Sequence, residues 1–223
     1  MRNLRLYLFS DHRIAANRPL DEMVLTAAGT RAPSVVWIPA GSQPERTLEF
    51  FEARKHYYSE LGVTNVTMLR LDEAISAQLV SDMVNCDIVH LSGGDPFVFL
   101  PNLRATGIFE VVRDRAVQGG VTVGDSAGAM LMGPNIEIAK FGHIPVPDHL
   151  FDLSALGLVD FEFHAHLGTY GASVDALRAY SHSRSTTVYG APDGSGVAIE
   201  GPRIVLHGPV VVFQNGETTL NHS

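Results

Sequence analysis

Short apolar segments alternate with longer helical segments between residues 4 and 123, and this alternation limits the possible folds more than any other feature. The apolar segments are nearly apolar throughout, which favours a parallel sheet covered by helices on both faces. The predicted strands are Leu4–Phe9, Ser34–Pro39, Asn65–Leu69, Asp87–Leu91 and Val121–Val123. The predicted helices are Leu20–Gly29, Glu45–Leu61 (ending at Gly62), Asp72–Asp82 (with Asp72 as N-cap) and about Phe97–Val117.

The last part of the chain follows a different pattern. Four apolar segments lie close together with Gly, Pro and Asp between them: Thr187–Tyr189, Gly196–Ile199, Arg203–Leu206 and Val210–Phe213. This spacing indicates antiparallel strands or hairpins added at one end of the sheet. We find no repeat, linker or low-complexity tract, so we predict one α/β domain over residues 1–223. Its expected architecture is a three-layer αβα sandwich with a mostly parallel central sheet and antiparallel strands near the C-terminus.

Charge and cysteine content exclude several kinds of partner. The net charge of −8, with no Lys/Arg cluster, argues against a nucleic acid or an anionic membrane surface. Cys86 is the only cysteine, so no internal disulfide can form, which fits a reducing compartment. The apolar run Leu4–Phe9 contains Arg5 and is too short for a signal-peptide core or a membrane span. We therefore predict a cytoplasmic protein that binds neither nucleic acid nor membrane.

The segment Gly-Asp-Ser-Ala-Gly at residues 124–128 suggests chemistry most directly. It matches G-x-S-x-G, in which a serine stands on a sharp turn between a strand and a helix while the glycines leave room for the turn. The predicted strand Val121–Val123 precedes Ser126, and the helix-forming stretch Ala127–Met132 follows it. We predict that Ser126 is a nucleophile on such an elbow. The alternative is a tight turn with no chemistry.

Acyl transfer by a serine requires backbone N–H groups aimed at the oxygen of the tetrahedral intermediate. The N–H of Ala127, directly after the nucleophile, is one candidate donor. Ser-Gly-Gly-Asp at residues 92–95 follows another predicted parallel strand, so Gly94 is the second candidate. A plain Gly-Gly turn is the alternative, and Asp95 is equally suited to be the N-cap of a helix beginning at Pro96.

Ser126 also needs a base, and the base needs an orienting acid. The chain has ten histidines, of which His164 and His166 lie at the end of a predicted strand beside Gly168. Surface-like surroundings are expected for His12, His56, His182, His207 and His222. Asp193, in a Pro-Asp-Gly turn, is one candidate acid. The others are Asp148, Asp152 and Glu162.

His164 and His166 also raise the possibility of a metal site. Residues i and i+2 of a strand share a face, so both imidazoles can converge on zinc. A third ligand is needed, and neither an HExxH motif nor a cysteine pair supplies one. We therefore predict neither a metal nor another cofactor.

Taken together, these residues resemble the dipeptidase E (alpha-aspartyl dipeptidase) and cyanophycinase family of serine peptidases. The resemblance covers most of the chain, and its best segments are Leu91–Phe97, Val121–Met130, Ala155–His166 and Val188–Gly194. It implies a fold similar to class I glutamine amidotransferases, with serine at the elbow where those enzymes carry cysteine. It also implies hydrolysis of small peptides through an acyl-enzyme, with N-terminal Asp-X dipeptides as one substrate class.

The resemblance also assigns roles to single positions. The matched residues are Ser126 for the nucleophile, His166 rather than His164 for the base, Asp193 for the third member (a glutamate in the family's Pro-Glu-Gly), and Gly94 and Ala127 for the oxyanion hole.

The chain departs from the dipeptidase E branch at two places that concern substrate preference. Ser-Gly-Gly-Asp-Pro at residues 92–96 replaces the usual Gly-Gly-Gly-Asn-Thr, and no arginine follows the base until Arg178. Another proposed acid of the branch falls near His143. The further candidates for substrate contact are Asp95, His143, His164 and Arg178.

Two other functions fit parts of the sequence. An α/β-hydrolase esterase has the same elbow but orders its triad Ser, acid, His, so it would need His182, His207 or His222 as its base. A catalytically silent binding domain on the same fold is the other alternative. One helix also carries aromatic residues that either pack on the sheet or form a partner face. They are Phe50, Phe51, Tyr57 and Tyr58.

Overall fold

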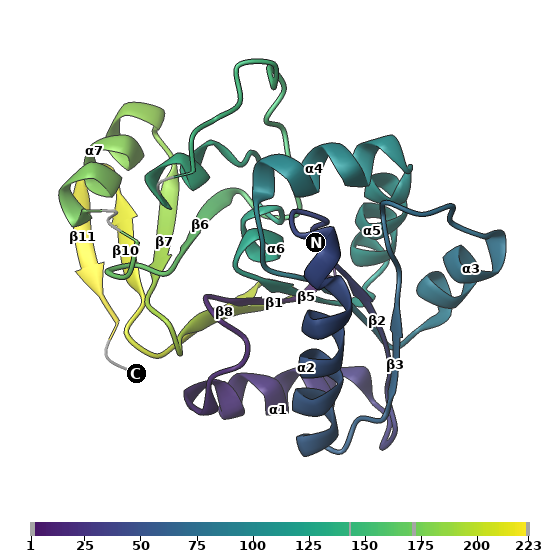
Figure 1. The fold of residues 1–223 in the computed structure, drawn as a ribbon. Helices are drawn as coiled ribbons and strands as arrows, with labels where there is room; N and C mark the ends of the chain where they lie inside the picture. Colours follow the sequence, from purple (N-terminus) through teal and green to yellow (C-terminus); the bar gives the residue numbers. More distant parts are fainter. Residues whose placement is uncertain (1–2, 143, 171–172, 222–223) are drawn as a thin grey trace.

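The computed structural model describes residues 3–142, 144–170 and 173–221, and its central feature is a seven-stranded sheet (Figure 1). The strand order is β3-β2-β4-β5-β1-β8-β9. Its strands are β1 (Arg5–Phe9), β2 (Ser34–Ile38), β3 (Asn65–Met68), β4 (Ile88–Leu91), β5 (Val121–Asp125), β8 (Gly196–Glu200) and β9 (Arg203–His207). The first five pair in parallel, and β8 and β9 are antiparallel additions next to β1. This confirms the predicted mostly parallel α/β sheet.

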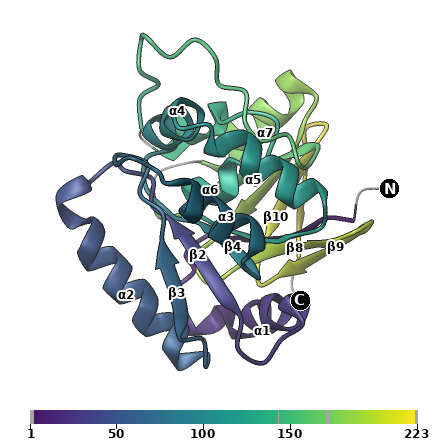
Figure 2. The same ribbon diagram turned by 90° about the vertical axis from the view of Figure 1, so that its right-hand side faces the viewer.

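Helices cover both faces of this sheet, as Figure 2 shows from the side. On one face lie α1 (Arg18–Ala28) and α2 (Thr47–Glu60). On the other lie α3 (Ala77–Asn85), α4 (Pro96–Ala105), α5 (Ile108–Val117) and α6 (Ala127–Met130). Alternation along β1 separates the two cores, because Tyr7 and Phe9 pack toward α1 and α2 whereas Leu6 and Leu8 pack in the opposite core. The described residues also form the short 3₁₀ helices η1 (Ala15–Asn17), η2 (Pro44–Arg46) and η3 (Glu137–Gly142).

A second, four-stranded sheet in the order β11-β10-β7-β6 corrects part of the prediction. Its strands are β6 (Phe161–Ala165), β7 (Thr187–Ala191), β10 (Val211–Gln214) and β11 (Glu217–Leu220). We expected the segments that form β7 and β10 at the end of the main sheet. They instead pair with each other in the second sheet. The reason is that β7 also pairs in parallel with β6, to which it is connected through α7 (Val174–Arg184). This helix packs Leu177 and Tyr180 on the second sheet.

Two helix boundaries also differ from expectation. The third helix begins at Ala77 rather than Asp72, because Ser76 accepts a hydrogen bond from the Leu79 N–H and caps it. Asp72 instead forms an ion pair with Arg70 at 2.6 Å. The predicted helical region Phe97–Val117 is two helices, since Gly107, with φ of 73°, breaks it.

The carboxyl ends of β1, β4 and β5 open toward the same edge of the main sheet, where ligands bind in parallel α/β folds. The turn between β7 and β8 connects the second sheet to the main one. None of the helices that the described residues form has the length and apolar character needed to cross a bilayer.

Candidate active site

Ser126 stands on a strained turn between β5 and α6. Its φ of 50° and ψ of −106° are unusual for a residue with a side chain. The backbone crowds the turn: a Cβ at Gly124 would lie 2.6 Å from the Gly128 oxygen, and one at Gly128 would lie 2.2 Å from the Leu91 oxygen. The Ser126 N–H donates to the Phe9 oxygen at 2.9 Å, which fastens the turn to β1. The two glycines of the motif are therefore required by close packing.

His166 follows β6 directly and brings its imidazole to Ser126 from the second sheet. Its Nε2 lies 2.9 Å from the Ser126 Oγ, and its Nδ1 lies 2.5 Å from the Asp193 Oδ1. Like Ser126, His166 has a positive φ, of 58°. With the proton on Nδ1, the ring donates to the carboxylate and its Nε2 is free to accept the serine proton.

Asp193 lies in the turn between β7 and β8, and its carboxylate reaches His166. Of the four carboxylates considered from the sequence, Asp193 is the one whose hydrogen bond with His166 the structure shows. Glu162 accepts instead from Tyr180 and is buried, and Asp152 pairs with Arg104 at 3.0 Å. The sequence alone did not distinguish these acids, because the turn that presents Asp193 is recognisable but its distance from His166 is not.

Ser10 is a buried neighbour of this trio that sequence reasoning missed. Its Oγ accepts a hydrogen bond from the His166 N–H at 2.7 Å and donates to the Asp193 Oδ1 at 3.0 Å. The signal in the sequence was its place: Ser10 is the first residue after β1, at the edge where the other strand ends meet.

The loop after β4 lies against Ser126, where Gly94 and the neighbouring turn can present N–H donors. A Cβ at Gly93 would be 3.5 Å from the Ser126 Cβ, and one at Gly94 would be 2.6 Å from the Ala40 Cβ. Gly94 has a φ of 142°, a conformation that favours glycine. Within residues 3–142, 144–170 and 173–221, the N–H groups of Gly94 and Ala127 form no hydrogen bond. Both expected donors are therefore available to a ligand.

A buried ion pair lies directly beside the Ser126 turn. Arg54 of α2 donates to the Asp125 carboxylate at 2.7 Å, and the same carboxylate accepts from the His12 N–H at 3.2 Å. The Arg54 guanidinium also contacts the His12 Nδ1. The prediction of surface-like surroundings for His12 is wrong, because His12 is 1% exposed.

The buried polar cluster extends away from Ser126 beneath α2. His12 Nε2 lies 2.9 Å from Asp21, which also accepts from the Tyr57 hydroxyl at 2.6 Å. Burial, followed by the charge of Arg54, lowers the pKa of His12, so the ring is held neutral. Tyr57 and the buried Tyr58 therefore pack inside the molecule rather than on a partner face.

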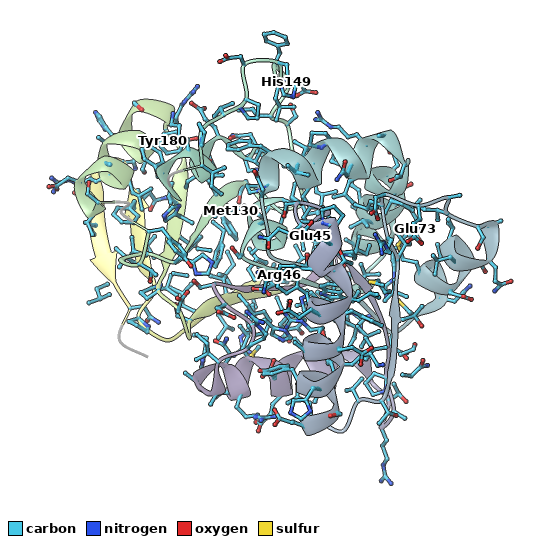
Figure 3. The ribbon with its side chains drawn as sticks, viewed as in Figure 1. Glu45, Arg46, Glu73, Met130, His149 and Tyr180 are labelled. Atoms are coloured by element: carbon cyan, nitrogen blue, oxygen red, sulfur yellow. The ribbon has the colours of Figure 1, made fainter. Side chains whose placement is uncertain are left out.

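A cavity of about 560 Å³ opens beside Ser126, between the strand ends and α2. Its wall includes Ser126, His166, Gly94 and residues of both charges. Arg46, labelled in Figure 3, contributes from η2, directly before α2, and pairs with Glu49 at 2.9 Å. The remaining charged residues of the wall are Asp11, Arg13, Arg54 and Asp125, and its aromatic residues are Trp37, Phe50 and Tyr170. This volume suits a ligand of a few residues.

Three residues expected to contact substrate lie outside this cavity wall. Asp95 accepts from the Phe97 N–H at 2.8 Å and caps α4, which is the alternative considered for it. Arg178 lies on α7 and pairs with Asp175 at 2.7 Å. His164 is buried within the second sheet. His143 lies outside the described residues.

His164 and His166 do not form a shared metal site. Both ring nitrogens of His166 have partners in Ser126 and Asp193. Burial, followed by the neighbouring His166, lowers the pKa of His164 to about 4. Within the part of the chain that the structure describes, no three His, Cys, Asp or Glu side chains are grouped to hold a metal ion.

Comparison with known proteins places this geometry in a family context. The model of Peptidase family S51 matches residues 7–207 of the chain. An uncharacterized peptidase from Pasteurella multocida is 27% identical over 163 residues, which cover 73% of this chain and 78% of that protein. Peptidase E from Salmonella arizonae is 28% identical over 198 residues, which cover 84% of this chain and 82% of that protein.

Solved structures share the fold. The crystal structure of a peptidase from an acI-B1 Actinobacterium aligns over 100% of this chain and 96% of that one, with a TM-score of 0.76 and 15% identity. The crystal structure of a protein from Listeria monocytogenes EGD-e, which carries a provisional peptidase E name, aligns over 91% and 97%, with a TM-score of 0.73 and 22% identity.

Proposed function

Because the chain belongs to peptidase family S51 and is a serine-type peptidase of the dipeptidase E type, we propose that Ser126, His166 and Asp193 form its catalytic triad. One observation carries this proposal. The hydrogen bonds from Ser126 Oγ to His166 Nε2 and from His166 Nδ1 to Asp193 Oδ1 join nucleophile, base and acid in the order that the chemistry needs. The residues come from three different elements, so their meeting is a property of the fold and not of local sequence.

The proposed reaction begins when His166 Nε2 takes the Ser126 hydroxyl proton and Oγ attacks the scissile carbonyl carbon. The carbonyl oxygen gains the negative charge and is held by the Gly94 and Ala127 N–H groups, which are free to donate. The C–N bond then breaks, and His166 gives its proton to the leaving amine. Water attacks the acyl-enzyme and gives a proton to His166, and the ester bond to Ser126 then breaks as His166 returns that proton to Oγ and the acid is released. Asp193 keeps the imidazole oriented and stabilises its charged form.

The turn geometry supports the nucleophile assignment. Ser126 holds a φ that costs on the order of 1–3 kcal/mol, and such strain persists where surrounding structure enforces it. The tight contacts of Gly124 and Gly128 supply that enforcement. We therefore propose that residues 124–128 form a nucleophile elbow.

Small peptides are the proposed substrates. The cavity beside Ser126 accommodates a short peptide and has cationic side chains, Arg13 and Arg46, on its wall. These offer a counter-charge to a peptide carboxylate, whether at the C-terminus or on an acidic side chain. We further expect the cytoplasm as its compartment, on the ground of its single cysteine.

The order of the proposed triad along the chain differs from that of an α/β-hydrolase esterase. The order here is Ser126, His166, Asp193, whereas those enzymes place the acid before the histidine. His207, one base that an esterase would require, donates to the Ala16 oxygen at 2.7 Å. His182 lies on α7.

A dipeptide library that includes α- and β-aspartyl members, read by mass spectrometry, tests the proposed function. We expect the wild-type protein to cleave a subset of the library, while the Ser126→Ala protein cleaves none. Ser181→Ala is the control, because it removes a serine hydroxyl on α7 that donates to the Thr186 oxygen and does not belong to the cavity wall. Equal cleavage by the Ser126→Ala protein, or no cleavage by the folded wild-type protein, would refute the proposal.

A further inference from the structure

Ser10 is joined to two members of the proposed triad by one hydroxyl group. Its Oγ accepts the His166 backbone N–H at 2.7 Å and donates to the Asp193 Oδ1 at 3.0 Å. Its own N–H donates to the Ser195 oxygen at 3.1 Å, and the residue is fully buried. No step of the reaction proposed above uses this hydroxyl.

Both groups that Ser10 contacts depend on outside support. His166 adopts a left-handed conformation, which is unfavourable for a residue with a side chain. The Ser10 Oγ gives its backbone N–H a partner in that conformation. In the described residues, the Asp193 carboxylate has two hydrogen bonds, from His166 and from Ser10, and both are to Oδ1. Without Ser10, the base alone would orient the acid.

The end of β1 also links the triad to one rigid frame. The Phe9 oxygen accepts the Ser126 N–H at 2.9 Å, and the next residue, Ser10, holds His166 and Asp193. β1 lies between β5 and β8 inside the main sheet, whereas His166 follows a strand of the second sheet. Two consecutive residues of one central strand end therefore fix the nucleophile, the base and the acid relative to each other.

We infer that Ser10 is a positioning residue, which holds the His166 backbone and the Asp193 carboxylate in register with Ser126. This inference rests on the proposed triad. During proton transfer to His166, Asp193 must keep accepting the Nδ1–H, and the Ser10 hydroxyl holds the accepting oxygen in place. The expected consequence of its loss is a lower rate of chemistry with unchanged binding, because Ser10 is buried and does not belong to the cavity wall.

Labelling of Ser126 by a fluorophosphonate measures the rate of the chemical step and the strength of binding separately, without knowledge of the natural substrate. In that reaction Oγ forms a bond to phosphorus, fluoride leaves, and His166 takes the serine proton. For Ser10→Ala we expect the maximal labelling rate to fall by about 10- to 100-fold, while the probe concentration at half-maximal rate changes less than about threefold. Ser181→Ala, which also removes a buried hydroxyl, is the control and is expected to label at the wild-type rate.

A double-mutant cycle separates positioning from a general structural role. If Ser10 acts through Asp193, adding Ser10→Ala to the Asp193→Asn protein should slow labelling by less than about threefold, far below its effect in the wild-type protein. Urea unfolding establishes that each variant is folded. Should Ser10→Ala fail to fold, Ser10→Cys takes its place, because cysteine fills the space but is a weak hydrogen-bond donor and acceptor. The same loss of rate is expected.

Two outcomes would overturn the role of Ser10 and leave the triad intact. One is a labelling rate for folded Ser10→Ala or Ser10→Cys equal to that of Ser181→Ala, while His166→Ala abolishes labelling. The other is an undiminished effect of Ser10→Ala in the Asp193→Asn background, because the Ser10 hydroxyl would then not act by holding the accepting oxygen of Asp193. Labelling of both the His166→Ala and Asp193→Asn proteins at the wild-type rate would instead refute the proposed catalytic triad itself.

Discussion

Arg54 and Asp125 form an ion pair of 2.7 Å whose side chains are 5% and 9% exposed, next to Ser126, the proposed nucleophile. The pair joins α2, which lines the cavity, to the end of β5, which presents Ser126. The geometry of the nucleophile turn and the shape of the cavity wall are therefore linked through one buried contact.

Removing one partner of this pair should destabilise the protein strongly. In Arg54→Met the Asp125 carboxylate stays buried without its counter-ion, and we expect a loss of about 3–5 kcal/mol in the free energy of unfolding. Urea unfolding measures it. The exposed pair of Arg178 and Asp175 supplies the control, because Arg178→Met should cost no more than about 1 kcal/mol. Equal losses of unfolding free energy in the two variants would show that burial does not determine how much the Arg54–Asp125 pair contributes to stability.

Replacing the acid should slow hydrolysis without affecting the fold. In Asp193→Asn the amide can no longer stabilise a charged His166, and it favours the wrong ring tautomer, so we expect kcat to fall by roughly 10³- to 10⁴-fold. The assay is hydrolysis of the best dipeptide found in the library. Asp175→Asn, on the surface of α7, is the matched substitution and should keep full activity. A kcat for Asp193→Asn near the wild-type value would mean that a group other than Asp193 orients His166.

A side chain at Gly94 should displace one of the two proposed oxyanion donors. The new Cβ of Gly94→Ala would fall 2.6 Å from the Ala40 Cβ, and φ of 142° is unfavourable for alanine, so the loop must shift. Loss of one such donor costs about 10²- to 10³-fold in kcat. Gly107→Ala, at a φ of 73° with open space around it, controls for backbone strain alone. If both variants hydrolyse the peptide equally fast, the Gly94 N–H does not hold the oxyanion.

Acid sensitivity of the fold should depend partly on His164. An unfolded histidine binds a proton below a pKa of 6.5, but burial delays this in the folded protein until about pH 4. The unfolded state thus binds more protons in this window, so the free energy of unfolding falls as pH drops from about 6.5 to about 4. The full difference is about 3 kcal/mol. Above pH 6.5 the effect of His164 on stability no longer changes.

Urea unfolding of His164→Leu at pH 7 and pH 5 tests this dependence. We expect a smaller loss of stability between the two pH values in the variant than in the wild-type protein, because His12 and His90 keep their contributions in both. The exposed His56 gives the comparison, and His56→Leu should retain the wild-type pH dependence. Identical pH dependence in all three proteins would mean that His164 is not held neutral.

The parallel part of the fold could be predicted because four of its strands, β1, β2, β4 and β5, are buried on both faces and therefore read as continuous apolar runs. β1, β2 and β4 lie within a residue or two of their predicted limits for this reason. The second sheet could not be predicted in the same way. β7 and β8 are consecutive and similar in sequence character, and their separation into two sheets depends on the pairing of β7 with β6, a contact between distant segments.

The candidate site shows the same division between local and distant information. The Ser126 turn follows from a local motif, since Gly124 and Gly128 are required by its packing. Ser10 and His12 were missed because their roles arise from partners far along the chain, such as His166 for Ser10 and Arg54 for His12. A lone serine or histidine after a strand carries no local signal of such partners.

The location of the adduct formed by a fluorophosphonate tests the central claim most directly. After labelling, digestion and mass spectrometry, we predict one adduct on Ser126 in the wild-type protein and none in Ser126→Ala. In His166→Gln the adduct should form at least roughly a thousandfold more slowly. An adduct on another residue of the Ser126→Ala protein at the wild-type rate, or labelling of Ser126 at full rate without His166, would contradict the account.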